Sequence, residues 1–262
     1  MKSNRIGWGI VSLVVLITLA ITFGTPDSHS QQKPQPIPTP QNNGYDDLSK
    51  YAIADYDAPE TGSAKEREER KLKSRRYDGQ HWVGSNVGPD DQKVGRIDED
   101  IPPPMIPVAE SKMIVIGDIL EANAYLSVDK KSVYTELTVC IEEILKEDSS
   151  NEMRKGSCLT ADREGGYVRY PNGQKVLYKI VTRDLPGAGR KYLLFLTNDR
   201  KSPNYTILTG FELKENTFIP LDRDNRSDDF TGANKSEFLN TVRTRISKSL
   251  KSDNSPHEKK QN

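Results

Sequence analysis

Short apolar segments rich in β-branched and aromatic residues, separated by turn signals, dominate residues 113–219. This spacing is typical of antiparallel β-structure. Within one segment Leu137, Val139 and Ile141 alternate with polar residues, as expected of a strand with one buried face. The sequence Pro-Asn-Gly at 171–173 is a strong hairpin signal. The expected strands lie at 113–120, 133–145, 158–162, 167–170, 175–181, 192–196, 205–211 and 218–219.

The number and spacing of these strands define the expected fold class. About eight strands with short connections favour a closed or nearly closed antiparallel barrel over a sandwich. We therefore expect a mainly β domain at residues 105–222, containing a small barrel of about 6–8 strands. A loop and a C-terminal helix are expected at 223–250, and a polar, disordered tail at 251–262.

The C-terminal helix has its own signature. Asn234 can cap it, and Glu237 follows three positions later in the capping-box pattern. Phe238, Val242 and Ile246 then recur every fourth residue, which predicts one apolar face. We expect this face to lie across one end of the barrel.

The N-terminus contains an unbroken apolar run at 6–23, preceded by Lys2 and Arg5. As a helix, these 18 residues would span roughly 27 Å, close to the thickness of a bilayer core. We expect residues 1–24 to form a signal-anchor that crosses the cytoplasmic membrane once, with the N-terminus inside and the bulk of the chain extracytoplasmic. The alternative is a secreted chain, cleaved near Ser30.

Residues 25–104 have little sustained apolar periodicity and are expected to form a disordered, proline- and charge-rich tether. Alternating prolines at 31–41 favour an extended spacer. Residues 63–76 are suited to a short helix, but it lacks an apolar face and is expected to be solvated. The aromatic cluster that follows is expected to dock on the domain rather than remain in the linker: Tyr77, His81 and Trp82.

Two cysteines are present, Cys140 and Cys158, on consecutive expected strands and on the face opposite the apolar one. Outside the cytoplasm they are candidates for a disulfide. Two separate, half-buried thiols are the alternative. A redox or nucleophilic role is not expected, because there is no CxxC motif and no nearby histidine.

The stretch that begins IPVAESKMIVIGDILEANAYLS and continues through SVYTELTVCIEEILK, REGGYVRYPNGQ and GRKYLLFL resembles an uncharacterised family of exported bacterial proteins. The resemblance covers under half of the chain and implies no known activity. The residues that carry it are Pro107, Gly117, Tyr134, Thr135, Glu136, Lys146, Gly165, Gly166, Gly189 and Phe195.

The same strands are more distantly similar to netrin-like domains and tissue inhibitors of metalloproteinases, which implies an OB-like barrel. The similarity does not extend to protease inhibition. Such inhibitors present an N-terminal cysteine to the metal of the protease, and no cysteine begins this domain.

No catalytic, cofactor-binding or metal-binding residues are expected from the motifs of this sequence. His29, His81 and His257 all lie outside the expected barrel, so no histidine-dependent nucleophile can form within it unless the His81 segment contributes. HExxH, P-loop and GxGxxG sequences do not occur. The acidic loop at 222–229 lacks the glycine and distal glutamate of an EF-hand.

These features predict a non-enzymatic, membrane-anchored extracytoplasmic binding module, with an envelope protein or glycan as its partner. Nucleic acid is not expected, because 38 basic residues balance 38 acidic ones. One alternative is a carboxylate- or metal-dependent envelope hydrolase using Asp118 and Glu136; the other is a purely structural envelope protein. The candidate binding surface consists of aromatic residues near turns: Tyr167, Tyr170, Tyr205 and Phe211.

Overall fold

The computed structural model describes residues 52–59, 61–80, 82–86, 91–96, 104–198, 204–223 and 228–253. The expected membrane helix at 6–23, the proline-rich stretch and the candidate cleavage site near Ser30 all lie outside these residues. Within the described ranges, no helix is both long enough and apolar enough to cross a bilayer.

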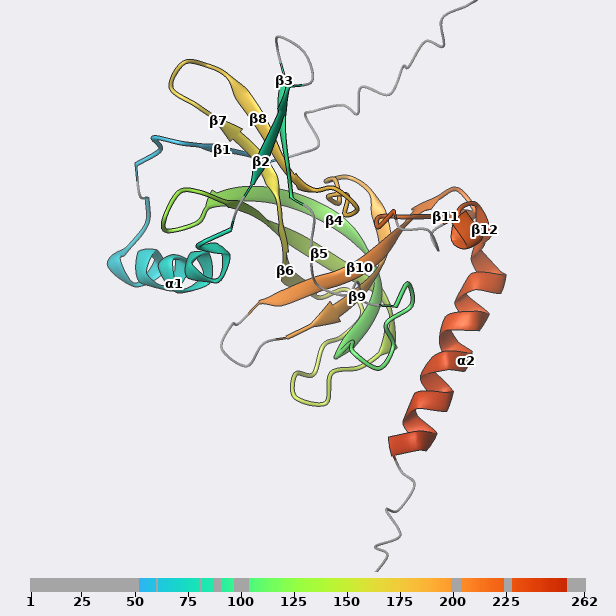
Figure 1. Ribbon diagram of the computed structural model, residues 1–262. Coiled ribbons are helices and arrows are strands. Elements are labelled where there is room, and N and C mark those ends of the chain that lie inside the picture. Colours follow the sequence, from blue (N-terminus) through green and yellow to red (C-terminus); the bar gives the residue numbers. More distant parts are fainter. Residues whose placement is uncertain are drawn as a thin grey trace, which may run out of the picture. The chain divides into compact units, whose positions relative to one another are not determined.

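Five strands form a closed barrel (Figure 1). The order around it is β4–β5–β6–β10–β9, and β9 pairs again with β4. The contact between β6 and β10 is parallel and the others are antiparallel. This confirms the prediction of a mainly β chain built around a barrel. The barrel strands are β4 (Met113–Leu126), β5 (Val133–Lys146), β6 (Cys158–Glu164), β9 (Lys191–Thr197) and β10 (Tyr205–Lys214).

The barrel itself has fewer strands than the 6–8 expected, because the chain leaves it at Gly165. This residue has φ 110°, and a Cβ atom there would lie 2.9 Å from the carbonyl oxygen of Tyr178. Only glycine fits such a backbone position without strain. Strands β7 (Gly166–Arg169) and β8 (Lys175–Ile180) then form a hairpin outside the barrel.

The β7–β8 hairpin is the centre of a second, five-stranded sheet. Strand β1 (Ile53–Asp55) pairs parallel to β7, and β3 (Asp91–Arg96) pairs parallel to β8. Strand β2 (Val83–Asn86) pairs antiparallel to β3. All three come from the expected tether, so the prediction of disorder is wrong for these residues. Their pairing is made by backbone groups, which require no apolar periodicity.

The barrel interior is apolar, and Leu137, Val139 and Ile141 point into it as the alternation predicted. A second core covers the outside of β4, β9 and β10, beneath helix α2 (Lys235–Asp253). It includes the predicted face of that helix. The shorter elements nearby are β11 (Thr217–Pro220), η3 (Asp228–Phe230) and β12 (Ala233–Asn234).

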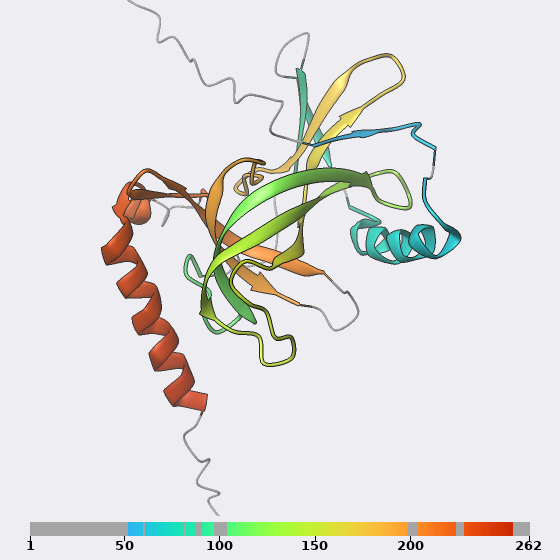
Figure 2. The ribbon, with the colours of Figure 1, turned by 180° about the vertical axis from the view of Figure 1, so that it is seen from behind.

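The predicted C-terminal helix is confirmed and ends at Asp253, three residues beyond the expected boundary at 250. Asn234 accepts a hydrogen bond from the Ser236 backbone N–H (3.0 Å), as a capping residue should. Helix α2 lies on the side of the barrel opposite helix α1, as Figures 1 and 2 show.

Cys140 and Cys158 face each other directly across the β5–β6 ladder and are joined by a disulfide. Their Cα atoms are 4.0 Å apart. Cys140 is half-buried and Cys158 is exposed, on the outer surface of the barrel.

Candidate functional site

Helix α1 (Ala64–Ser74) begins with a capping box. The Glu66 carboxylate accepts a hydrogen bond from the Ser63 backbone N–H (2.7 Å), and the Ser63 hydroxyl accepts one from the Glu66 N–H (3.3 Å). Hydrogen bonding of its carboxylate with the backbone and the side chain of Ser63 lowers the pKa of Glu66. The short helix η2 (Arg75–Tyr77) continues the chain. The predicted helix is therefore confirmed.

Helix α1 remains largely exposed, as expected of a helix without a continuous apolar face, but its C-terminal end and η2 dock on the barrel. Tyr77, at the end of η2, stacks on Tyr134 of β5 with 4.4 Å between ring centroids. Both rings are buried, and burial raises the pKa of both hydroxyl groups. The predicted docking is thus confirmed for Tyr77. The rings of Trp82 and Tyr178 meet edge to face, with 5.3 Å between their centroids. His81 lies outside the described residues.

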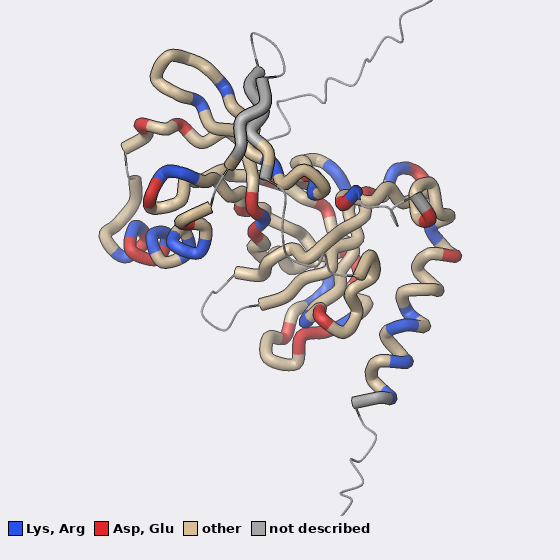
Figure 3. Tube along the Cα trace, viewed as in Figure 1, with Lys and Arg blue, Asp and Glu red and all other residues tan. Residues whose placement is uncertain are grey.

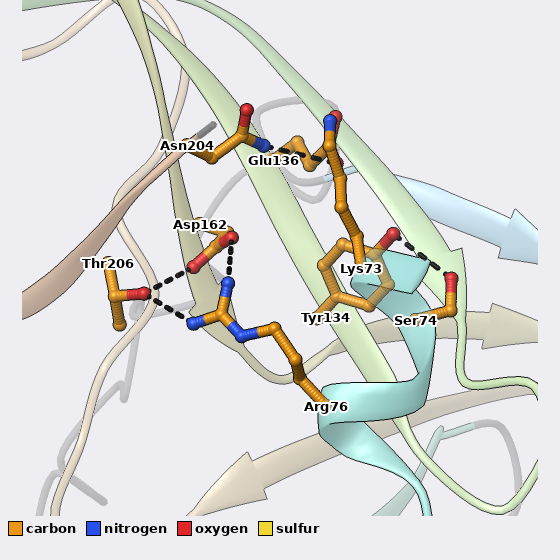
Figure 4. A network of polar contacts seen from close by, with 8 residues as sticks. All are labelled: Lys73, Ser74, Arg76, Tyr134, Glu136, Asp162, Asn204 and Thr206. Carbon is orange, nitrogen blue, oxygen red and sulfur yellow. Dashed lines mark hydrogen bonds and ion pairs between the residues drawn. The ribbon is translucent and has the colours of Figure 1, made fainter. Parts of the chain in front are cut away.

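An ion pair links η2 to the outer surface of the barrel (Figure 4). Arg76 places Nη1 3.3 Å from Asp162 Oδ2 and donates from Nη2 to the Thr206 hydroxyl (2.8 Å). Thr206 in turn donates to Asp162 Oδ1 (2.9 Å). The Asp162 side chain is fully buried. Burial raises its pKa, and the nearby Arg76 charge opposes that rise.

A second set of polar contacts fastens α1 itself to β5 (Figure 4). Lys73 Nζ lies 3.1 Å from Glu136 Oε1, which also accepts from the Asn204 side-chain amide (3.4 Å). The hydroxyl groups of Ser74 and Tyr134 share a hydrogen bond of 3.2 Å. Together with Arg76, these contacts hold the helix against three barrel strands.

The structure does not bring together the two carboxylates proposed for hydrolysis. Glu136 is bound to Lys73 and Asn204, as described above. Asp118 lies opposite Cys140 in the β4–β5 ladder, whereas Glu136 lies opposite Asn123. The ion-pair partner of Asp118 is Lys191 of β9 (3.7 Å).

Beside this polar network, a pocket of about 360 Å³ lies between β1, α1, the end of β4 and the loop that follows it. In Figures 1 and 2, β1 lies on one side of the β4–β5 hairpin tip and α1 on the other. Ser74 lines the pocket and belongs to the polar network, so the two features are continuous. The apolar lining residues are Ile53, Ala54, Ala58, Pro59, Ala124, Leu126 and Val128.

Among the described lining residues of this pocket, basic residues outnumber acidic ones. Both basic and acidic residues lie along α1 (Figure 3). The acidic residue among the described lining residues is Asp55, which forms an ion pair with Arg169 of β7 (3.2 Å). The basic lining residues are Arg67, Arg70, Lys71 and Lys130.

Two of these cations lie over tyrosine rings that also line the pocket. The Arg70 guanidinium carbon is 5.1 Å from the ring centroid of Tyr125. Lys130 Nζ is 4.9 Å from the ring centroid of Tyr56. Both distances are within the range of cation–π attraction. The pocket therefore has a cation–aromatic pair contributed by α1 and another contributed by the β4–β5 loop.

Asp129 connects the β4–β5 loop to the end of η2. Its carboxylate accepts from the Gly79 N–H (2.9 Å), and its own N–H donates to Asp78 Oδ1 (3.0 Å). Burial opposes ionisation, but the hydrogen bonds from the Ser127 hydroxyl and from the backbone lower the pKa of Asp129 to about 2.

Because the pKa of Asp129 is lowered, the contribution of this carboxylate to the free energy of unfolding should depend on pH. The ionised carboxylate stabilises the folded state above an unfolded-state pKa of about 4, and this contribution disappears as the pH falls toward 2. Substitution Asp129→Ala should therefore destabilise the protein near neutrality and lose its effect over that pH range. Urea denaturation of both proteins between neutral pH and about pH 2 measures the difference in their free energies of unfolding. Glu121→Ala, an exposed carboxylate of the same hairpin, is the matched control. A difference from wild type that stays constant with pH would contradict the assignment.

The four aromatic residues predicted as a binding surface do not form one. Tyr205 and Phe211 are buried in the two cores, and Tyr167 is buried where β7 pairs with β1. Tyr170 is half-buried, and its ring stacks on that of the lining residue Tyr56 with 5.0 Å between the ring centroids. None of the four lines the pocket.

Four residues of the pocket were not predicted as site residues from the sequence: Tyr56, Arg70, Tyr125 and Lys130. Each lies in a segment that looks solvated by composition, and no local pattern links them. The helical periodicity of 63–76 and the hairpin turn at 127–132 were available signals, but they do not indicate that the two segments meet.

The described part of the chain contains no group of three or more histidine, cysteine, aspartate or glutamate residues placed to hold a metal ion. A comparison of the chain with known protein families finds no match, and a comparison with curated protein sequences finds none.

Proposed function

We propose that this chain is a non-enzymatic, membrane-anchored extracytoplasmic binding module that holds a small ligand in the pocket between β1, α1 and the β4–β5 loop. The pocket itself supports this proposal. Its volume of about 360 Å³ falls within the range typical of small-molecule sites. Its walls combine apolar side chains, two tyrosine rings and a small number of charged groups, which is the usual composition of such sites.

The barrel topology supports an OB-type assignment. In chain order the barrel strands are arranged 1-2-3-5-4, with strands 3 and 5 parallel. OB barrels bind oligonucleotides and oligosaccharides with the face of strands 2 and 3 and with loops that include the one between strands 1 and 2. Here these are the face of β5 and β6 and the loop at 127–132. Helix α1 packs on that face and the loop lines the pocket.

Membrane anchoring and extracytoplasmic location are proposed on the apolar run at 6–23 and its basic flank. An anchored module with a ligand pocket is suited to binding a partner in the envelope, either a protein or a glycan. Occupancy of the pocket would then affect the binding of that partner.

Native mass spectrometry of the full-length protein, purified from membranes of its native host, tests the proposal. We expect a small molecule bound to the wild-type chain. Val128→Trp, which fills the pocket from a position with 45% exposure, should abolish this binding. Leu120→Trp is the control, because Leu120 has 58% exposure on β4 and does not line the pocket.

A purely structural role would be indicated if the wild-type chain and both variants carry no ligand. The intact mass from the same sample shows whether residues 1–30 remain attached, which separates an anchored chain from a cleaved and secreted one.

A further inference from the structure

We infer that the pocket binds an oxyanion, a carboxylate or phosphate, attached to a small apolar body. This inference rests on the proposed function, because it names the ligand class of the same site. The first observation is the charge of the walls. Among the described lining residues four are basic and one, Asp55, is acidic, and the Asp55 carboxylate already pairs with Arg169. An anionic ligand would complement this excess of positive charge.

The second observation is the bonding of Arg70 and Lys130. Arg70 donates to the carbonyl oxygen of Thr61 (3.3 Å) and lies over Tyr125. Lys130 donates to the carbonyl oxygen of Tyr56 (3.0 Å) and lies over the ring of the same residue. Among the described residues, neither forms an ion pair. All these partners are neutral, so they orient the two cations without neutralising them.

Glu66, one helical turn before Arg70, does not alter this assignment. Glu66 interacts electrostatically with Arg70, but its carboxylate accepts a hydrogen bond from the backbone N–H of Ser63 in the capping box. A guanidinium has five N–H donors and an ammonium has three. Arg70 and Lys130 each use one donor on a carbonyl, so both retain donors for an oxyanion.

The third observation is the remainder of the lining. Ile53, Leu126 and Val128 provide apolar surface next to the two cation–tyrosine pairs. A free inorganic anion would leave this surface in contact with water, whereas an aliphatic or aromatic body would cover it. The ligand class is therefore amphipathic: an oxyanion with a compact apolar group.

The test uses the full-length chain in nanodiscs of phosphatidylcholine, titrated calorimetrically with hexanoate and phenyl phosphate. The neutral analogues hexanol and benzyl alcohol are titrated in parallel, and empty nanodiscs provide the blank. We expect both anions to bind and the alcohols to bind at least tenfold more weakly. Arg70→Gln and Lys130→Gln should each weaken anion binding about tenfold, the loss expected for one charge-assisted hydrogen bond.

Lys65→Gln is the matched control, because it removes the same charge from an exposed position of the same helix. It should leave anion binding unchanged; an equal loss in this variant would indicate non-specific attraction and overturn the inference. Arg70→Lys should retain the preference for anions, which distinguishes loss of the charge from loss of the fold.

The source of the anion is tested by exchanging phosphatidylcholine for phosphatidylglycerol. Competition by the anionic nanodisc would identify a lipid headgroup as the occupant, and unchanged affinity would identify a free amphiphile. Equal binding of alcohols and anions, abolished by Val128→Trp, would overturn the inference but support the proposed pocket. If none of these probes binds and the native spectrum shows no ligand, both proposals fail.

Discussion

Replacing Arg76 with methionine is expected to lower the free energy of unfolding by about 3–5 kcal/mol, the usual cost of breaking a buried ion pair from one side. The side chain of Asp162 is fully buried, and Arg76 contacts both its carboxylate and Thr206. Methionine keeps most of the side-chain length but leaves the carboxylate without this counter-charge. Equilibrium urea denaturation at neutral pH measures the loss.

The same substitution at Arg75 is the control, because Arg75 is the preceding residue and is exposed. Arg75→Met should change stability little. The deficit of the Arg76 variant should also shrink in acid, because the pKa of Asp162 is raised and a protonated carboxyl group needs no counter-charge. Equal stability of the two variants, or a deficit independent of pH, would show that the pair does not hold α1 to the barrel.

Substitution Phe211→Ala is expected to lower the free energy of unfolding by a similar amount, about 3–5 kcal/mol. Phe211 is fully buried beneath α2, and its ring centroid lies 4.7 Å from that of Phe238. Three further phenylalanine rings surround it at 6.1–6.4 Å: Phe195, Phe218 and Phe230. Truncation would remove ring contacts and leave a cavity that the neighbouring rings fill only in part.

Phe211→Leu should cost much less, because it keeps most of the buried volume. Chemical denaturation of the Phe211→Ala and Phe211→Leu variants compares their free energies of unfolding. Since Phe211 does not line the pocket, the leucine variant should retain pocket binding. A stable alanine variant with impaired ligand binding would instead favour the surface role first predicted for this residue.

The strands were predictable because the information that defines them is local. Alternation along β5 and the turn at 171–173 place strands within a few residues of the observed bounds. Strand β4 was expected to end at 120 but continues to Leu126. Apolar residues alternate with polar ones in its last six residues, but two of these apolar residues are alanines, which are weak strand formers. The strand is fixed there by pairing with β5.

The docking of α1 was not predictable from local pattern. It depends on Arg76 meeting Asp162 and on Tyr77 meeting Tyr134, contacts between residues far apart in the chain. The error at Phe211 has a different cause. Alternation predicts which residues share a face of a strand, but not whether that face is covered. A bulge between Ile207 and Thr209 also shifts the register, and α2 covers the outer face.

The parallel pairing of β1 with β7 has a consequence for the order in which the chain is made. Strand β1 precedes β7 by more than a hundred residues, so at ordinary rates of translation it emerges on the order of ten seconds before its partner. During that interval its backbone groups lack the partner that β7 provides. Because β1 has only three residues, it offers a short template for unwanted association. The wall that β1 contributes to the pocket is thus completed only after β7 has been synthesised, and a nascent chain that stops earlier would lack the site.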